Sequence, residues 1–207
     1  SDLDPTGGID ARDRIQQTFE LVLTSFAFVA GAAAAHGVVA RHRARGYDRL
    51  VFSRPLSPVR YYTQGFVLAG IGAVILGTVG AEVYAVAVHP VSLPGVAGYV
   101  ALAWLLVGGL AFLLSIVTAF YLPVLTLVLA ADLALDYFAG PLSAAGVGPV
   151  AAAIQLALPP AHVLVTLRAP FARGLPIDPG GLAWPAGFGV ACIVAAMVLL
   201  RRWPFRS

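Results

Sequence analysis

The chain has no lysine, because all thirteen of its basic residues are arginine. A Walker A loop needs a lysine to hold the nucleotide phosphates, so this chain by itself does not hydrolyse ATP in that way. The single cysteine, Cys192, excludes an internal disulfide. Charged residues of either sign make up only 11% of the 207 residues. The position of each charge is therefore more informative than the net charge of +3.

What the chain has in abundance is apolar sequence. Hydrophobic residues make up 59% of the chain, and the mean hydropathy is +0.87. Several charge-free runs exceed the roughly 20 residues that cross a bilayer; the runs are Leu21–Ala40, Tyr61–Ala81, Val83–Ala131, Tyr137–Leu167 and Pro179–Leu200. These runs predict an all-α integral membrane protein with a single transmembrane domain, and nothing in the sequence favours a nucleic acid as partner.

The apolar runs predict five transmembrane helices, at residues 17–40, 62–88, 96–120, 121–138 and 182–200. Residues 1–16 would precede the first span, and residues 139–181 would form a long proline- and glycine-rich segment before the last span. Within that segment, Val150–Leu158 is typical of a re-entrant or interfacial helix that ends at the Pro159-Pro160 pair. The first residues, Ser1–Asp13, are polar and acidic and are not a signal peptide.

The arginines predict the orientation of these spans. Nine of the thirteen lie in two segments, residues 41–61 and 201–207. Cytoplasmic loops carry an excess of arginine and lysine, so both segments, including the C-terminus, are expected on the cytoplasmic side of a cell (inner) membrane. Residues 1–16 and 139–181 would then be external. Five spans place the N-terminus outside, and we expect a sixth span upstream if the gene product starts in the cytoplasm.

The arginine-rich segment between the first two spans has a helical pattern of its own. Tyr47, Leu50 and Val51 fall at i, i+3 and i+4 and share one face of a short amphipathic helix. Pro55 ends that helix, because the residue before a proline is pushed out of the α region. Ser57-Pro58 is then typical of an N-cap with proline at the first helical position. A loop of this kind either binds lipid headgroups or docks onto a partner.

The sequence of this segment, "YDRLVFSRPLSPVRYYTQGF" (Tyr47–Phe66), resembles the loop between the second and third transmembrane helices of ABC-2 type transporter permeases. In that family a glycine-containing charged turn leads into a leucine-rich helix, then Ser-Arg-Pro-Leu-Ser, then a tyrosine and a glycine. The matching residues here are Gly46, Leu50, Ser53, Arg54, Pro55, Leu56, Ser57, Tyr61 or Tyr62, and Gly65. The five spans would equal the family's second to sixth helices.

The resemblance implies that residues 46–53 form a coupling helix that docks onto a separate ATP-binding subunit. The docking residues would be Tyr47, Arg49, Leu50, Val51, Arg54 and Pro55. It also implies a dimer with a second permease copy or a paralogue. Two positions depart from the family: Arg41-His42-Arg43 stand where an acidic residue is usual, and Phe66 stands where a lysine is usual. They keep open an alternative, a permease-derived structural subunit of a larger respiratory or photosynthetic complex.

Acidic residues at membrane depth form a second candidate site. Such residues are costly to place in a membrane and are functional candidates by default. Glu82 stands alone near the outer end of the second span, and Asp132 and Asp136 share a face of the fourth at i, i+4. Asp132 is the deepest of the three. We expect no catalytic dyad, no metal ligand set and no cofactor, and the four histidines do not pair at matched depth as a b-type haem requires.

Overall fold

The computed structural model describes residues 7–35 and 57–202, and every regular element in those residues is helical. The elements are α1 (Gly7–Ala35), α4 (Pro58–Ala87), α5 (Leu93–Ala103), the π-helical turn η2 (Trp104–Gly108), α6 (Gly109–Val117), α7 (Tyr121–Tyr137), α8 (Ala139–Ala144), α9 (Gly148–Ala157), α10 (Ala161–Arg173) and α11 (Pro179–Arg202). The prediction of an all-α chain is confirmed for this part of the sequence.

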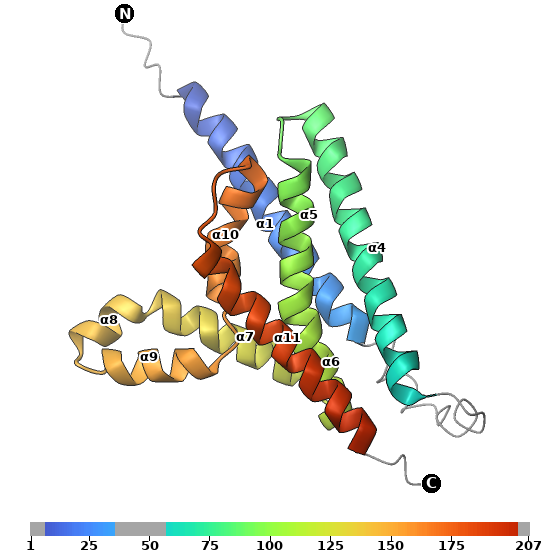
Figure 1. Cartoon of the computed structure of the whole chain (residues 1–207). Helices are drawn as coiled ribbons and strands as arrows, with labels where there is room; N and C mark the ends of the chain where they lie inside the picture. The colour runs from blue at the N-terminus through green and yellow to red at the C-terminus, as the bar shows by residue number, and fades with distance from the viewer. Residues whose placement is uncertain (1–6, 36–56, 203–207) are drawn as a thin grey trace, which may run out of the picture.

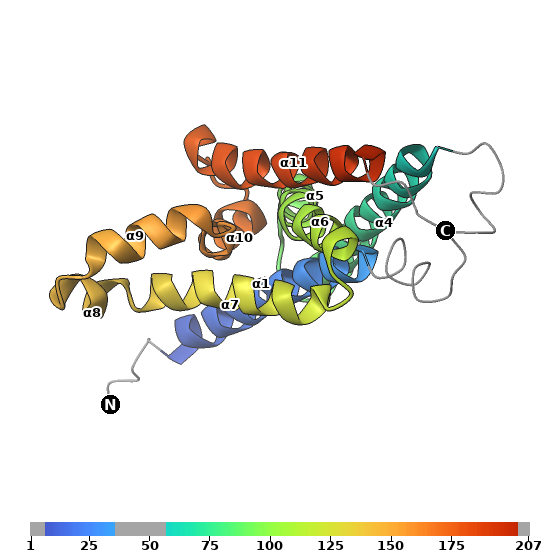
Figure 2. The ribbon, with the colours of Figure 1, turned by 90° about the horizontal axis from the view of Figure 1, so that it is seen from below.

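The helices pack around one central element. The segments α5, η2 and α6 form a single run, Leu93–Val117, and α1, α4, α10 and α11 all pack against it (Figures 1 and 2). Burial agrees with this arrangement. In the most apolar 18-residue stretch of each helix, 67% is buried in the central run, against 28% in α4 and 22% in α11. The surrounding helices therefore present most of their apolar surface outward, as helices in contact with lipid do.

Three of the described helices are long and apolar enough to cross a membrane: Val59–Ala87, Leu93–Val117 and Pro179–Arg202. The bent pair α9–α10 brings the number to four if it forms one span. The helix α7 has 17 residues and carries two aspartates, and α1 has 29 residues. The chain is thus consistent with a multi-pass membrane protein, and the division into five spans stays a prediction.

Prolines and serines set the starts of two long apolar helices. The helix α4 begins at Pro58 with Ser57 at the N-cap position, as the Ser-Pro pair predicts, although the Ser57 hydroxyl makes no capping hydrogen bond. The helix α5 begins one residue after Ser92, whose hydroxyl accepts a hydrogen bond from the amide of Gly95 at 3.2 Å. Proline tolerates the first helical turn because its missing N–H has no partner there anyway.

Glycine allows helices of the bundle to approach each other closely. A Cβ atom placed on Gly189 of α11 would lie 2.5 Å from the carbonyl oxygen of Leu105 in η2, and one on Gly109 would lie 2.8 Å from the carbonyl oxygen of Gly189. The backbones of α11 and the central run therefore touch directly. Small residues permit this approach in membrane bundles, where packing rather than the hydrophobic effect drives association.

The segment from α7 to α10 departs from the bundle and returns to it. The helix α7 leads away from α6, and α8 and α9 extend to one side, with no buried residue in either (Figures 1 and 2). The chain turns back at Pro159-Pro160, where α9 and α10 are bent by 78°. A helix that ends at this proline pair was predicted, and the reason is that neither proline offers an N–H for a helical hydrogen bond.

Candidate intramembrane polar site

The predicted coupling residues Tyr47, Arg49, Leu50, Val51, Arg54 and Pro55 lie outside the described residues. The described part of the chain ends at Ala35 and resumes at Ser57, on either side of them. The predicted acidic site lies within the described residues, and its three members differ in environment.

Asp132 is fully buried and holds the start of another helix. It lies on α7 with 0% of its surface exposed. One carboxylate oxygen, Oδ2, accepts a hydrogen bond from the backbone N–H of His162 at 2.8 Å. His162 is the second residue of α10, so the carboxylate meets the unpaired N–H groups and the positive end of that helix dipole. Asp132 therefore serves as a cap supplied from a different helix.

The imidazole of His162 is also bound to Asp132. Its Nδ1 lies 2.9 Å from Oδ2 and 3.0 Å from Oδ1. A carboxylate can only accept hydrogen bonds, so Nδ1 carries the proton in the neutral ring. The amide nitrogen Nε2 of Gln155 lies 3.3 Å from the same nitrogen. Asp132 thus fixes both the backbone and the side chain of His162.

Asp136 and Glu82 lack such an environment. Asp136 stands one turn beyond Asp132 on α7, and its side chain is exposed. Glu82, on α4, is also exposed. In the described residues neither carboxylate has an ion-pair partner. The structure therefore brings together Asp132 with His162 and Gln155, and it does not join Asp136 or Glu82 to them.

A second buried carboxylate, Glu20 of α1, was missed in the sequence. Only 3% of Glu20 is exposed. Its Oε1 accepts a hydrogen bond from the Arg173 guanidinium at 3.4 Å, and its Oε2 lies 3.8 Å from Nε of Arg168. Both arginines lie in the second half of α10. The signal available in the sequence was an acid directly before the charge-free run 21–40.

Hydroxyl groups continue this polar cluster into the bundle. The Thr24 hydroxyl, one turn after Glu20, donates a hydrogen bond to the carbonyl of Glu20 at 2.8 Å. It lies 3.0 Å from the hydroxyl of Tyr99 on α5, and both residues are buried. Because Thr24 donates to the carbonyl, the Tyr99 hydroxyl is the donor in their shared bond. The cluster therefore connects α1, α5 and α10.

The two carboxylates together hold α10 in place. Asp132 on α7 binds its first turn, and Glu20 on α1 binds its second half. At its end, the carbonyl of Ala172 accepts a hydrogen bond from the amide of Ser92 at 2.9 Å. The helix Ala161–Arg173 is thus tied to three other parts of the bundle by polar contacts. In the described residues no group of three or more His, Cys, Asp or Glu side chains could hold a metal ion.

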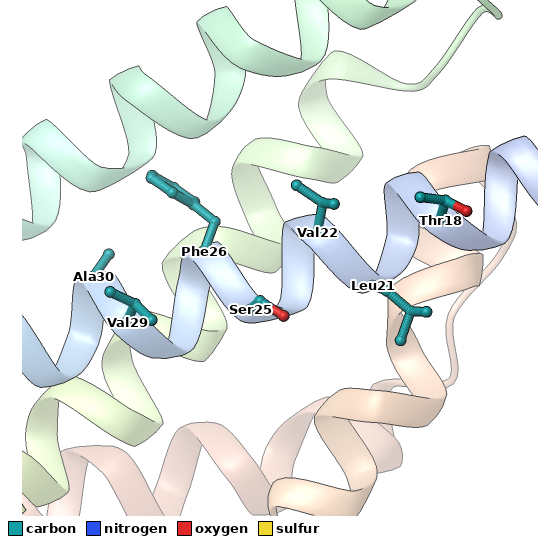
Figure 3. Close-up of a pocket in the computed structure, with 7 residues that line it drawn as sticks. All are labelled: Thr18, Leu21, Val22, Ser25, Phe26, Val29 and Ala30. Atoms are coloured by element: carbon teal, nitrogen blue, oxygen red, sulfur yellow. The ribbon is translucent and has the colours of Figure 1, made fainter.

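An open groove follows one face of α1, lined by Thr18, Leu21, Val22, Ser25, Phe26, Val29 and Ala30 (Figure 3). All seven residues come from that single helix, and its apolar members Leu21, Val22 and Val29 are exposed. The lining is apolar apart from two hydroxyl groups, and no charged side chain points into it. A surface of this kind is suited to lipid chains or another apolar helix rather than to a polar ligand.

The fold and the polar site together define a class, an all-helical protein consistent with several passes through a membrane. Comparisons with protein-family models, with curated proteins and with solved structures find no match to this chain.

Proposed function

We propose that this chain is the membrane-spanning permease subunit of an ABC-2 type transporter, which moves a substrate by means of a separate ATPase subunit. The observation that carries the proposal is the segment Tyr47–Phe66, with its Ser-Arg-Pro-Leu-Ser core between a short amphipathic pattern and a long apolar helix. This order of elements is the one found in the coupling loop of that family.

The arrangement of the helices supports a docking role for this segment. The C-terminal end of α1, the start of α4 and the C-terminal end of α11 lie toward the same end of the molecule (Figure 1). Arg60 near the start of α4 and Arg201 and Arg202 at the end of α11 are exposed there. By the positive-inside rule this end is cytoplasmic, the side on which an ATPase subunit binds.

The docking residues of the loop would have three distinct roles. Tyr47, Leu50 and Val51 are the apolar anchor that fills a groove on the partner. Arg49 and Arg54 pair with acidic groups around that groove. Pro55, followed by the helix start at Ser57-Pro58, stiffens the joint so that movement of the partner reaches α4.

A second candidate is a structural subunit that keeps the permease fold without transport. The observation that favours it is Phe66, which stands at the family's usual lysine position. Phe66 is 2% exposed and packs on Trp104 and Phe112, with ring centroids 3.9 Å and 5.0 Å away. A position that carries charge in the family is thus devoted to packing in this chain.

Substitutions in the loop test the proposal. Removing a buried apolar anchor from an interface costs on the order of 2 kcal/mol or more, whereas losing one arginine near a lipid surface costs about 1 kcal/mol. We expect Tyr47→Ala with Leu50→Ala to abolish retention of a co-expressed ATPase subunit while membrane insertion is unchanged. Arg49→Gln with Arg54→Gln should weaken retention less than the apolar pair does, and it would be the more damaging pair if the loop only bound lipid.

Co-purification separates the two candidate functions. A stoichiometric ATPase partner that is lost in the Tyr47→Ala, Leu50→Ala variant supports the transporter. If that variant retains both the ATPase and transport, the coupling role is wrong. Isolation of the chain within a respiratory or photosynthetic assembly that lacks any ATPase supports the structural subunit instead.

A further inference from the structure

The arginines of α10 have far more hydrogen-bond donors than the structure uses. Each guanidinium carries five N–H groups. Within the described residues, Arg173 makes one hydrogen bond, of 3.4 Å, to Glu20, and Arg168 approaches Glu20 only at 3.8 Å, which is too long for a hydrogen bond. The Arg168 side chain is 26% exposed. Among the described residues, no guanidinium nitrogen of Arg168 or Arg173 is a buried donor without a partner, so the donors that Glu20 does not use remain open to solvent or to a ligand.

The charges of this cluster do not balance. In the described residues Glu20 is the only carboxylate paired with either arginine, so two positive charges face one negative charge. Glu20 itself is 4% exposed in its side chain, whereas 45% of Arg173 is accessible. The carboxylate therefore lies on the buried side of the cluster, and the excess positive charge is shared by the two more accessible guanidiniums.

The cluster lies at the level where a membrane ends. The carbonyl of Ala172, next to Arg173, accepts a hydrogen bond from Ser92. Ser92 belongs to the short connection between two candidate spans, Val59–Ala87 and Leu93–Val117. A residue beside that connection is at the depth of the lipid headgroups, where phosphate groups are concentrated.

We infer that Arg168 and Arg173 form a binding site for the phosphate group of an anionic ligand, either a phospholipid headgroup or a soluble phosphate compound. Guanidinium groups bind phosphate through paired N–H donors that match its oxygen atoms. Glu20 holds the two guanidiniums near each other and leaves their remaining donors for the ligand. The site does not depend on the proposed transport function, because it lies on α10 and α1 rather than on the coupling loop.

Ligand titration of the purified full-length chain in a neutral detergent tests the site. The probes are inorganic phosphate and a short-chain phosphatidylglycerol, with short-chain phosphatidylcholine to report the effect of acyl chains, and the measurement is the thermal unfolding midpoint. Arg168→Gln with Arg173→Gln should raise the half-saturating probe concentration about tenfold or more, the effect of losing charged hydrogen bonds. Arg201→Gln with Arg202→Gln removes as much charge from the other end of the bundle and should leave the response unchanged.

Two further variants separate binding from folding. Glu20→Gln should lower the half-saturating concentration, because both guanidiniums then lack a competing carboxylate. Glu20→Gln combined with Arg168→Gln and Arg173→Gln leaves no unpaired charge and should fold, yet respond to neither probe. Saturation by phosphatidylglycerol alone assigns the site to a lipid headgroup, and an equal response to inorganic phosphate assigns it to a soluble compound. The inference is wrong if wild type responds to neither probe, or if both arginine pairs behave alike.

Discussion

Four acidic side chains of similar chemistry have two different environments in this protein. Asp132 and Glu20 are almost completely buried, and Asp136 and Glu82 are exposed. A buried carboxylate needs hydrogen bonds or an opposite charge to offset the loss of water. Asp132 has the N–H groups of His162, and Glu20 has two guanidiniums. The helix position alone does not separate the two groups, because Asp132 and Asp136 lie one turn apart on α7.

The first prediction concerns Asp132. Replacing it with Asn keeps the size but removes the negative charge that the start of α10 and the His162 N–H groups bind. We expect the free energy of unfolding to fall by about 1–3 kcal/mol, the cost of a lost charged hydrogen bond. Asp136→Asn, one turn away and exposed, should change it by less than about 0.5 kcal/mol. Equal effects in a denaturation experiment would show that Asp132 is not a cap.

The second prediction concerns the asymmetry of the Glu20 cluster. Arg168→Gln with Arg173→Gln leaves a buried carboxylate unpaired and should cost about 3 kcal/mol or more of stability. Glu20→Gln leaves two arginines that can still reach water, so its cost should be about 1 kcal/mol or less. Thermal unfolding of both variants checks the order. The triple variant Glu20→Gln, Arg168→Gln, Arg173→Gln should regain most of the stability that the two arginine substitutions remove. If it does not, the arginines stabilise α10 through packing alone.

At the scale of whole elements, the central run from Leu93 to Val117 is held by backbone contact as well as by side chains. The π-helical turn Trp104–Gly108 places the carbonyl of Leu105 against Gly189 of α11. Gly31 of α1 lies against the same turn, since a Cβ atom there would be 3.0 Å from the amide nitrogen of Gly108. Two helices thus meet this turn at glycine, and any side chain at these positions would push them apart.

The third prediction uses two glycines of α11 that lie on different faces. Gly189→Ala places a methyl group 2.5 Å from the Leu105 carbonyl oxygen, and we expect a loss of about 1–3 kcal/mol, as in other overpacked sites. Gly187→Ala meets nothing within 4 Å and should be neutral or slightly stabilising, because alanine favours helix over glycine. Unfolding curves of the two variants provide the comparison. A loss of stability at Gly187 as large as that at Gly189 would contradict this packing.

For the molecule as a whole, the two ends of the bundle differ in charge. Arg60, Arg201 and Arg202 are exposed at the end where α1 and α11 finish, whereas the opposite end carries Arg168 and Arg173 bound to Glu20. In the predicted orientation this opposite end is non-cytoplasmic, where arginine opposes the positive-inside rule. Its partial neutralisation by Glu20 reduces that conflict, so the positive-inside rule and the ion pairs are compatible.

The fourth prediction follows for the orientation in a cell membrane. In a Cys192→Ser background, Phe52→Cys should react with a membrane-impermeant thiol reagent only after the membrane is opened. Leu175→Cys, in an exposed position after α10, should react from outside in intact cells. Labelling of both residues measures the sidedness directly. Reaction of residue 52 from outside would reverse the orientation.

The fifth prediction is that the purified chain does not turn over ATP, because it has no lysine for a phosphate-binding loop. Steady-state phosphate release, measured with a chain free of other ATPases, provides the test. Turnover at rates typical of an ATPase would mean that another nucleotide site exists in the chain.

Much of the architecture was predictable because it depends on residues that are close together in the sequence. Long runs without charge predict apolar helices, since a backbone in lipid must satisfy its hydrogen bonds internally. Ser57-Pro58 and Pro159-Pro160 predict where α4 begins and where α9 and α10 part, because proline has fixed local geometry. Hydropathy alone did not predict that Leu93–Val117 is the central element, since α4 and α11 are also apolar along their length.

The sequence by itself determined an all-helical, apolar chain and its proline breaks, because both depend on local composition. The tertiary structure decided which acids are bound. Asp132 meets a histidine 30 residues away, and Glu20 meets an arginine 153 residues away. No spacing rule connects positions so far apart, since their meeting depends on how α1, α7 and α10 pack. That packing makes α10 a helix held by buried carboxylates. It also leaves N–H donors of Arg168 and Arg173 that Glu20 does not use.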